Sequence, residues 1–272
     1  MDARLQHRVQ RYGWDRAAPI YEQSWQRQLE PAQTRLMEMA ALAPGERVLD
    51  LACGTGLVTF RAAGITGPDG AVIGTDISDG MIESCTLAAQ ARGVRHATFQ
   101  RMPAERLSFP DGSFDAVLCG LGMMYVVDFA GSIQEMFRVT RSGGRAVSAV
   151  WGRRDRCGWS EIFEIVQRRV SSEVCPMFFQ LGTGDLQKLL FEAAGFVDVR
   201  SDRLATTLEY ASGEEACVAA FVGGPVAMAY SRFDDETRAG AHAEYLESIM
   251  AYRRGEGYGL PGEFVVTVGY RR

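Results

Sequence analysis

The chain has 272 residues, 47% of them hydrophobic, and a formal net charge of −5 at pH 7. This length and apolar content predict a single domain with a packed interior, spanning residues 1–272. The net negative charge argues against a broad binding surface for nucleic acid or for an anionic membrane. No stretch approaches the ~18 consecutive apolar residues of a membrane span, and the first residues lack the apolar core of a signal peptide. We therefore expect a cytoplasmic protein with no integral membrane segment.

Residues 1–43 are predicted to form one or two amphipathic helices. Leu36 and Met39 recur at helical spacing, and a Pro-Gly pair then closes the segment. From residue 46 to residue 151, short apolar strands alternate with helices, which is typical of a parallel, doubly wound sheet. A helix at 185–194 and a strand at 197–203 continue this pattern, and an apolar strand ends the chain. The predicted fold class is therefore α/β.

The stretch 47–60 carries the strongest motif of the chain, R-V-L-D-L-A-C-G-T-G-L-V-T-F. It reads as a buried strand, a glycine turn and the start of a helix, which places a helix N-terminus at the carboxyl end of a strand. A Cβ at Gly54 or Gly56 would hinder the tight turn or the approach of a ligand to the backbone. Such a turn alone is weak evidence, because dinucleotide dehydrogenases, methyltransferases and plain strand–helix connections all use it.

Two carboxylates and one threonine narrow the class of ligand. Asp50 lies inside the strand, where a carboxylate can hold the loop and meet an ammonium group. Asp76 ends the next strand-like run, 71–76, at about the 20-residue distance expected of an acid that binds a ribose. Thr59 occupies the position of the third glycine of a dinucleotide fingerprint, which argues against a nicotinamide oxidoreductase. A nucleoside with a positively charged, amino-acid-like end fits these residues better than a pyrophosphate does.

With these motifs the sequence resembles the class I S-adenosylmethionine-dependent methyltransferases, and within them the small-molecule enzymes similar to the ubiquinone/menaquinone C-methyltransferases. Four blocks carry the resemblance: V-L-D-L-A-C-G-T-G at 48–56, G-T-D-I-S-D-G-M-I at 74–82, and two longer blocks at 99–128 and 135–145. The resemblance implies a Rossmann-like sheet of seven mostly parallel strands. It also implies S-adenosylmethionine as the cofactor and S-adenosylhomocysteine as the product formed from it.

In this fold, insertions after the fifth strand and between the last two strands lie over the substrate mouth. The segments 152–182 and 205–262 are therefore expected to form a helical lid, and residues 1–43 a helical cover over the cofactor. Trp14 and Tyr21 of that cover can contact the ligand or pack onto the core.

The resemblance implies one set of cofactor-binding residues, which come from the cover and from the first three blocks: Tyr21, Asp50, Ala52, Gly54, Thr55, Gly56, Asp76, Ile77, Met81, Pro103, Ala104, Glu105, Cys119 and Gly120. Asp50 would order the loop or receive the amino group through water. Asp76 would bind the ribose hydroxyls or cap the next helix, and Ile77 and Met81 would clamp the adenine. Related enzymes carry an acidic residue or asparagine where this chain has Pro103, so adenine recognition is expected to use the neighbouring backbone.

The acceptor is expected to be a small, hydrophobic metabolite of quinone, polyketide or isoprenoid type, methylated on carbon or oxygen. The residues expected to line its site follow the fourth strand or lie in the lid: Gly122, Met123, Met124, Phe179 and Met228. Methionines at a strand–helix junction also serve as core filler, which is the competing interpretation.

Methyl transfer depends on positioning and on a dry cavity more than on covalent help from the protein. The candidates for a general base are His242, Tyr21 and Tyr125. No His/Asp/Glu cluster has metal-ligand spacing, so no metal is expected. The sequence leaves open a protein of the same fold that binds the cofactor but catalyses another reaction, such as a cyclisation. It also leaves open whether the chain forms a homodimer.

Overall fold

The computed structural model describes residues 3–170 and 178–272, so part of the expected lid segment 152–182 lies outside the described residues. Within them, seven strands form the main path of one sheet in the order β3-β2-β1-β4-β5-β8-β6, and the two-residue strand β7 pairs with β8. β8 is antiparallel to both β5 and β6, and the remaining neighbours on the path are parallel. The predicted α/β class with a mostly parallel sheet is confirmed. The strands are β1 (Arg47–Leu51), β2 (Ala71–Asp76), β3 (Ala97–Arg101), β4 (Phe114–Gly120), β5 (Thr140–Trp151), β6 (Val197–Tyr210), β7 (Arg253–Arg254) and β8 (Gly257–Tyr270).

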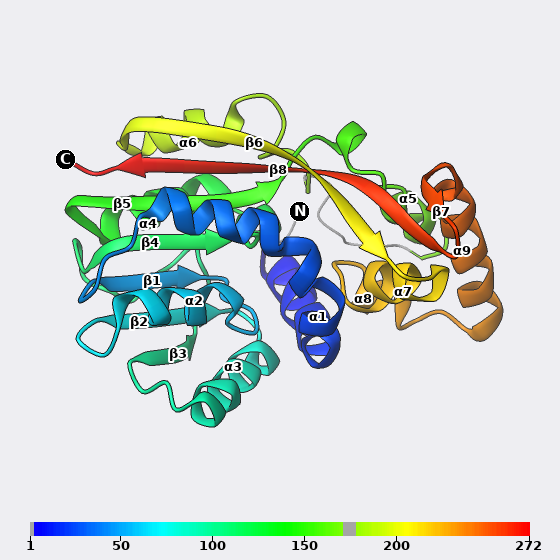
Figure 1. Cartoon of the computed structure of the whole chain (residues 1–272), viewed down its shortest axis with the longest axis horizontal. Helices are drawn as coiled ribbons and strands as arrows, with labels where there is room; N and C mark the ends of the chain where they lie inside the picture. Colours follow the sequence, from blue (N-terminus) through cyan, green and yellow to red (C-terminus); the bar gives the residue numbers. More distant parts are fainter. Residues whose placement is uncertain (1–2, 171–177) are drawn as a thin grey trace.

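Helices cover both faces of the sheet (Figure 1). The helices α1 and α2 lie on one face, and α4 lies on the other together with α6, which packs against it. Because both faces are covered, the central strands are buried on both sides, and Leu49, Val117 and Val147 are inaccessible to solvent. These helices and the one between β2 and β3 are α1 (Ala3–Ala40), α2 (Leu57–Thr66), α3 (Asp79–Arg92), α4 (Phe129–Val139) and α6 (Leu186–Ala194).

The strands β6 and β8 are much longer than the sequence predicts. They continue to pair until Tyr210 lies opposite Tyr258, so the expected lid boundaries, 205 and 262, fall inside two strands. Continued pairing satisfies the backbone, and inward residues such as Leu208 stay fully buried. The two strands extend past the carboxyl ends of β1 and β4 to the end of the molecule that carries the remaining helices (Figure 1). The elements not yet given are α5 (Ile162–Gln167), α7 (Gly213–Cys217), α8 (Ala227–Tyr230), α9 (Asp235–Ser248), a π-helical turn (Val218–Val222) and 3₁₀ turns at Met123–Tyr125, Arg154–Arg156 and Met250–Tyr252.

The helix α1 runs as one element through two prolines, Pro19 and Pro31. Each proline removes a backbone donor and bends a helix, and α1 changes direction along its length in Figure 1. Asp15 joins it to the start of α3, where its Oδ1 accepts hydrogen bonds from Ser78 Oγ at 2.6 Å and from Gly80 N at 3.1 Å. This contact places one side of α1 beside the carboxyl end of β2.

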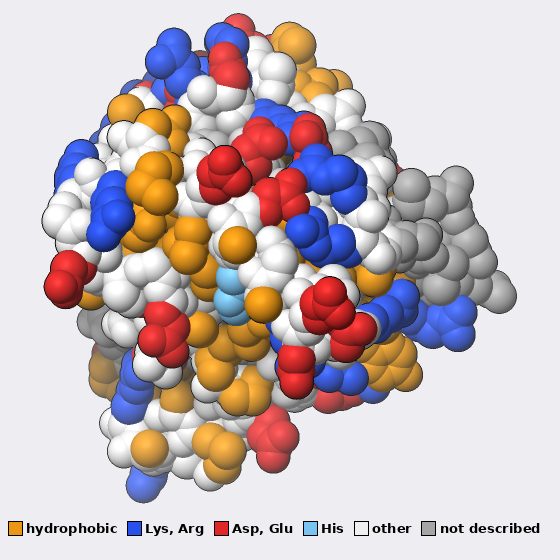
Figure 2. Space-filling model, turned by 90° about the vertical axis from the view of Figure 1, so that its right-hand side faces the viewer, with side chains coloured by type: hydrophobic (Ala, Val, Ile, Leu, Met, Phe, Trp, Pro, Cys, Tyr) orange, Lys and Arg blue, Asp and Glu red, His pale blue; other side chains and the backbone are white. Residues whose placement is uncertain are grey.

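Figure 2 shows the face at the end of the molecule that carries α5, α7, α8 and α9, where basic side chains lie beside acidic ones. Within this region Arg168 and Arg169 both pair with Glu244, and Arg154 pairs with Glu164. The described residues of that face therefore present no basic block to a polyanion. Among the residues that the structure describes, none of the helices combines the length and the apolar composition that a membrane crossing requires.

Candidate active site

A cavity of about 710 Å³, including its solvent-open mouth, lies at the carboxyl ends of β1, β2 and β4. This is where open α/β sheets bind their ligands. The structure brings residues from five separate parts of the chain to this cavity. The sequence-predicted residues that line it are Tyr21, Ala52, Gly54, Asp76, Ile77, Met81, Pro103, Ala104, Glu105, Gly120, Gly122 and Tyr125, and Trp14 lines it as well.

The glycine turn after β1 brings bare backbone to the cavity. Ala52 and Gly54 have positive φ angles of 53° and 55°, a conformation that costs little only at glycine. A Cβ at Gly54 would point across the cavity toward the ring of Tyr21, 3.9 Å from Cε1. A Cβ at Gly122 would lie 2.3 Å from the Cβ of Ala52, so the loops after β1 and β4 meet without room for a second side chain.

Gly56 and Thr55 do not line the cavity, although the sequence places them in the same turn. A Cβ at Gly56 would lie 2.6 Å from Cε2 of Phe60, so the packing of α2 explains this glycine. Thr55 is buried, and its Oγ1 has no hydrogen-bond partner among the described residues.

Asp76 shapes the turn as well as the cavity. Its Oδ2 accepts a hydrogen bond from Gly54 N at 3.0 Å, and its Oδ1 accepts one from Ser78 N at 2.9 Å. Burial raises the pKa of Asp76 to about 6, against the opposing effect of these backbone donors. Asp76 is not the cap of α3, because Ser78 holds that position and its Oγ accepts from Met81 N at 3.1 Å.

Asp50 lies beneath the turn and does not line the cavity. Thr59 Oγ1 donates to its Oδ2 at 2.6 Å, whereas its Oδ1 is buried without a partner among the described residues. Burial raises the pKa of Asp50 to about 7. The hydroxyl of Thr59 therefore has a structural role, because it binds Asp50. A glycine, which a dinucleotide fingerprint would have at this position, could not form this hydrogen bond.

The N-terminal turns of α1 reach the loop after β3. His7 Nε2 and Glu105 Oε1 lie 2.8 Å apart, and the same carboxylate oxygen accepts from Val127 N at 3.3 Å. Glu105 thus links α1, the loop after β3 and the segment before α4 at the rim of the cavity. Pro103 also lines the cavity, and a proline side chain has no hydrogen-bond acceptor to offer a ligand.

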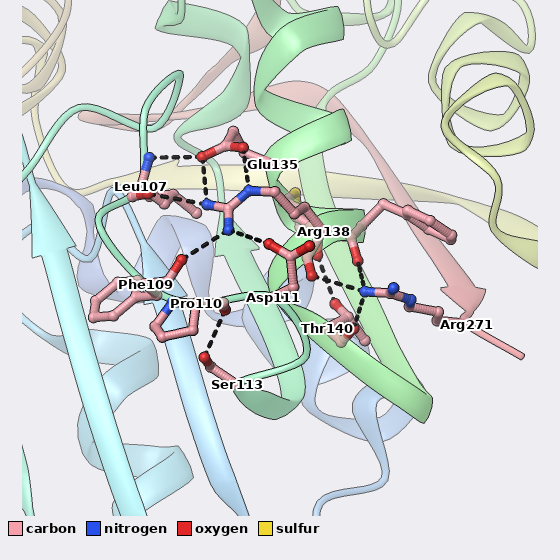
Figure 3. A network of polar contacts seen from close by, with 11 residues as sticks. Leu107, Phe109, Pro110, Asp111, Ser113, Glu135, Arg138, Thr140 and Arg271 are labelled. Carbon is pink, nitrogen blue, oxygen red and sulfur yellow. Dashed lines mark hydrogen bonds and ion pairs between the residues drawn. The ribbon is translucent and has the colours of Figure 1, made fainter.

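Arg138 of α4 holds the rest of the loop between β3 and β4 (Figure 3). Its guanidinium donates to the carbonyl oxygens of Leu107 at 2.9 Å and Phe109 at 2.8 Å, and it pairs with Asp111 at 2.8 Å and Glu135 at 2.6 Å. Hydrogen bonds from Arg138 lower the pKa of Glu135 below its usual range. One side chain on α4 therefore braces the loop that carries the rim of the cavity.

We expect Arg138→Ala to lower the free energy of unfolding by about 2–3 kcal/mol, because two carbonyl and two carboxylate groups lose a charged donor. This loss is smaller than the sum of the separate hydrogen bonds, because the Arg138 side chain is 31% exposed and water can replace part of what is removed. Urea denaturation measures the change. Arg141→Ala is the matched control, because Arg141 pairs with Asp115 in a half-exposed ion pair worth about 0–1 kcal/mol. Equal losses in both variants would contradict the bracing role.

Five lining residues were not predicted: His7, Gln10, Met102, Leu121 and Val126. For His7 and Gln10 the sequence does contain a pattern that could have predicted this. Together with Trp14 and Tyr21, His7 and Gln10 recur at helical spacing along one stripe of α1. No local pattern distinguishes Leu121 from core residues, because its place depends on how the loop after β4 meets the turn after β1.

Several predicted residues do not line this cavity. Cys119 and Met123 are fully buried in the core, Met124 is 97% buried, and burial raises the pKa of Cys119 to about 12. Phe179 packs in an aromatic cluster with Trp159, and Met228 packs against α1 near Gly13. Met123, Phe179 and Met228, which the sequence placed near the acceptor, thus pack against other side chains and do not line this cavity.

His242, a candidate for the general base, lies outside this cavity. It lies on α9, where its Nε2 is 2.9 Å from the hydroxyl oxygen of Tyr230 and its ring packs against Phe221. Burial lowers the pKa of His242, and the charge of Arg238 lowers it further. His242 is therefore neutral near pH 7 but does not line the cavity.

Comparison with known proteins matches the chain to methyltransferases. A family model described as a methyltransferase domain matches residues 48–144. A demethylmenaquinone methyltransferase of Geobacillus stearothermophilus is 31% identical over 183 residues, which cover 60% of this chain and 76% of that protein. Aklanonic acid methyltransferase DauC of Streptomyces sp. (strain C5) is 34% identical over 132 residues, which cover 48% of this chain and 60% of that protein. The matched segment thus spans less than two thirds of DauC.

Among solved structures, the YcgJ protein of Bacillus subtilis superposes with a TM-score of 0.62 at 18% identity. The superposition covers 89% of this chain and 99% of that one. This likeness concerns the fold.

Proposed function

The chain belongs to the class I S-adenosylmethionine-dependent methyltransferases, and on that premise we propose that it methylates a small, hydrophobic metabolite of the quinone or polyketide type. The observation that carries the proposal is the cavity, in which the glycine turn, Asp76 and the aromatic side chains of α1 face one space. Two relatives, named for demethylmenaquinone and for aklanonic acid, support this acceptor class.

The polar groups around the turn after β1 suit a polar ligand such as S-adenosylmethionine, because Asp76 and bare backbone line the cavity. Beneath the cavity, at the carboxyl ends of β1 and β2, Asp50 Oδ1, Thr55 Oγ1 and Thr75 Oγ1 are buried without partners among the described residues, and none of these three residues lines the cavity itself. Buried oxygens of this kind are usually paired with ordered water, which could bridge Asp50 to the amino group of the cofactor.

In this proposal, Asp76 binds the ribose hydroxyls, and the bare backbone at Ala52 and Gly54 binds the amino-acid end. Ile77 and Met81 clamp the adenine. S-adenosylmethionine supplies a methyl group on a sulfonium, which an acceptor carbon or oxygen takes up as the acceptor loses a proton.

The aromatic side chains of the cavity keep the reacting atoms dry and suit a cationic sulfonium. Trp14 lies edge-on to Tyr21 and Tyr125, with ring centroids 5.7 and 4.8 Å apart. Ring faces attract cations, and the exclusion of water strengthens that attraction. Burial, and secondarily the charge of Asp76, raises the pKa of Tyr21, so its hydroxyl stays protonated and does not act as a base. Tyr125 remains the proposed base where the acceptor needs one.

We expect S-adenosylmethionine and S-adenosylhomocysteine to raise the Tm, and NAD and NADP to leave it unchanged. A ligand at 100 times its Kd stabilises the folded state by about 2.7 kcal/mol, which thermal denaturation resolves easily. A shift with NAD alone would overturn the cofactor assignment.

A second measurement separates methyl transfer from another reaction in the same fold. The protein is incubated with S-adenosylmethionine and a panel of phenols and hydroquinones, and the mixture is analysed by mass spectrometry. Equal amounts of methylated product and S-adenosylhomocysteine are expected. An acceptor that is consumed without S-adenosylhomocysteine formation would instead indicate a reaction such as a cyclisation.

A further inference from the structure

One stripe of α1 lines the cavity. His7, Gln10, Trp14 and Tyr21 all belong to its lining, and they follow one another at intervals of three, four and seven residues, which places them on the same side of the helix. The contacts that these residues and their neighbours on α1 make with the rest of the protein therefore show which part of the cavity each of them faces.

The two ends of the stripe lie at different parts of the cavity. Tyr21 faces the turn after β1, where a Cβ at Gly54 would lie 3.9 Å from Cε1 of the tyrosine. His7 lies at the loop after β3, with its Nε2 2.8 Å from Glu105 Oε1. Gln10 is less than one helical turn from His7 and about three turns from Tyr21, so it lies near the loop after β3.

Contacts of α1 with the start of α3 fix the position of Gln10 further. Arg11, the next residue along the helix, pairs with Asp79 in the first turn of α3. Asp15, one turn later, accepts a hydrogen bond from Ser78 Oγ at 2.6 Å. Gln10 therefore faces the part of the cavity that lies between the start of α3 and the loop after β3.

The loop after β3 offers a ligand few side-chain acceptors in this part of the cavity. Pro103 has none. Glu105 has one, but its Oε1 already lies 2.8 Å from His7 Nε2 and accepts from Val127 N at 3.3 Å. Gln10, in contrast, makes no side-chain hydrogen bond with any other residue that the structure describes. Its amide therefore has both an acceptor oxygen and a donor nitrogen available for a ligand.

From this placement we propose that Gln10 recognises the adenine of the cofactor: its amide oxygen accepts from the N6 amino group, and its amide nitrogen donates to an adjacent ring nitrogen. A primary amide matches this donor–acceptor pair of adenine with two hydrogen bonds. The inference rests on the proposed function, in which Ile77 and Met81, at the start of α3, clamp the adenine. Gln10 is then a specificity-determining residue, and α1 supplies the acceptor that Pro103 lacks.

The test compares two ligands that differ only in the N6 amino group. They are S-adenosylhomocysteine and its 6-deamino analogue, in which purine replaces adenine, and titration calorimetry measures the Kd of each. The wild-type protein is expected to bind S-adenosylhomocysteine about tenfold more tightly than the analogue. Gln10→Met keeps the length of the side chain but has only a weakly accepting thioether, so it should reduce this preference to about twofold or less.

Gln10→Glu separates recognition of the amino group from a general effect on the helix. A carboxylate still accepts from N6 but cannot donate to the ring nitrogen. This variant should therefore retain the preference for S-adenosylhomocysteine, while both ligands bind more weakly than they do to the wild type. A role of Gln10 in packing alone predicts instead that the two variants change the affinities for both ligands by the same factor.

Gln26→Met is the matched control, because Gln26 lies on the same helix, is exposed and does not line this cavity. It should leave the preference unchanged. The Tm of Gln10→Met without ligand should equal that of the wild type, since the amide has no partner among the described residues. An equal preference in the wild type and in Gln10→Met would overturn the proposal and assign the acceptor to Glu105 or to the backbone. Failure of S-adenosylhomocysteine itself to bind the wild type would overturn the proposed function instead.

Discussion

Asp76→Ala is expected to weaken the binding of S-adenosylhomocysteine by about 1.5–3 kcal/mol, or roughly 10- to 150-fold. The carboxylate lines the cavity and is 93% buried, so its loss removes a charged acceptor from a site with little water to replace it. The same side chain accepts from Gly54 N and Ser78 N. The substitution therefore also releases the turn that presents backbone to the ligand.

Titration calorimetry at pH 8 measures the change, and Asp79→Ala is the matched control. Asp79 lies three residues further along but is half-exposed and pairs with Arg11 and Arg101. Asp76→Asn is a second variant that keeps the shape of the side chain. Unchanged affinity in both Asp76 variants, with a lowered Tm, would show that Asp76 only braces the turn.

The centre of this site is predictable from the sequence because its determinants are local. The strand, the glycine turn and Asp76 lie within 30 residues, and their spacing alone places them at neighbouring strand ends. The resemblance to a family supplies the roles of Ile77 and Met81, and both residues do line the cavity. The local pattern does not reveal which groups bind each carboxylate. Asp50 accepts a hydrogen bond from Thr59, and Asp76 accepts hydrogen bonds from the backbone N–H groups of Gly54 and Ser78.

The periphery of the site depends on contacts between distant parts of the chain. His7 reaches the cavity because α1 is a single helix held against α3 by Asp15, and no spacing rule links residues 7 and 105. The full lengths of β6 and β8 are missed for a similar reason. The pairing of β6 with β8 continues as far as Tyr210 because the two partners bury each other's side chains, which neither strand's sequence reveals alone.

Without ligand, the protein is expected to become less stable as the pH rises from 5 to 8. Burial raises the pKa of Asp50 to about 7 and that of Asp76 to about 6, well above the ordinary value of 3.8. The folded state thus binds protons more tightly than the unfolded state. This contribution to stability is complete below pH ~4 and is lost as the pH rises through 6 and 7, at about 1.4 kcal/mol for each unit of pKa shift.

Other titrating groups change the stability between pH 5 and pH 8 less than Asp50 and Asp76 do, or in the opposite direction. The pKa of Glu135 is lowered by Arg138, so its contribution is lost only at more acidic pH. His242, whose pKa is lowered by burial, favours the folded state less as the pH falls. Asp50→Asn isolates the effect, because asparagine can still accept from Thr59 but does not titrate. Its Tm should exceed that of the wild type at pH 8 and approach it at pH 5.

Cofactor binding should show the opposite dependence on pH. A sulfonium and an ammonium near Asp50 and Asp76 favour the ionised carboxylates, so binding lowers both pKa values and releases protons. Affinity for S-adenosylmethionine should therefore rise from pH 5 to pH 8. S-adenosylhomocysteine, whose sulfur is uncharged, should show a weaker rise. Calorimetry in two buffers of different ionisation enthalpy counts the protons released near pH 6.5. Equal, pH-independent affinities for the two ligands would mean that neither carboxylate senses the cofactor's charge, and the ammonium and sulfonium would then have to lie away from the turn after β1.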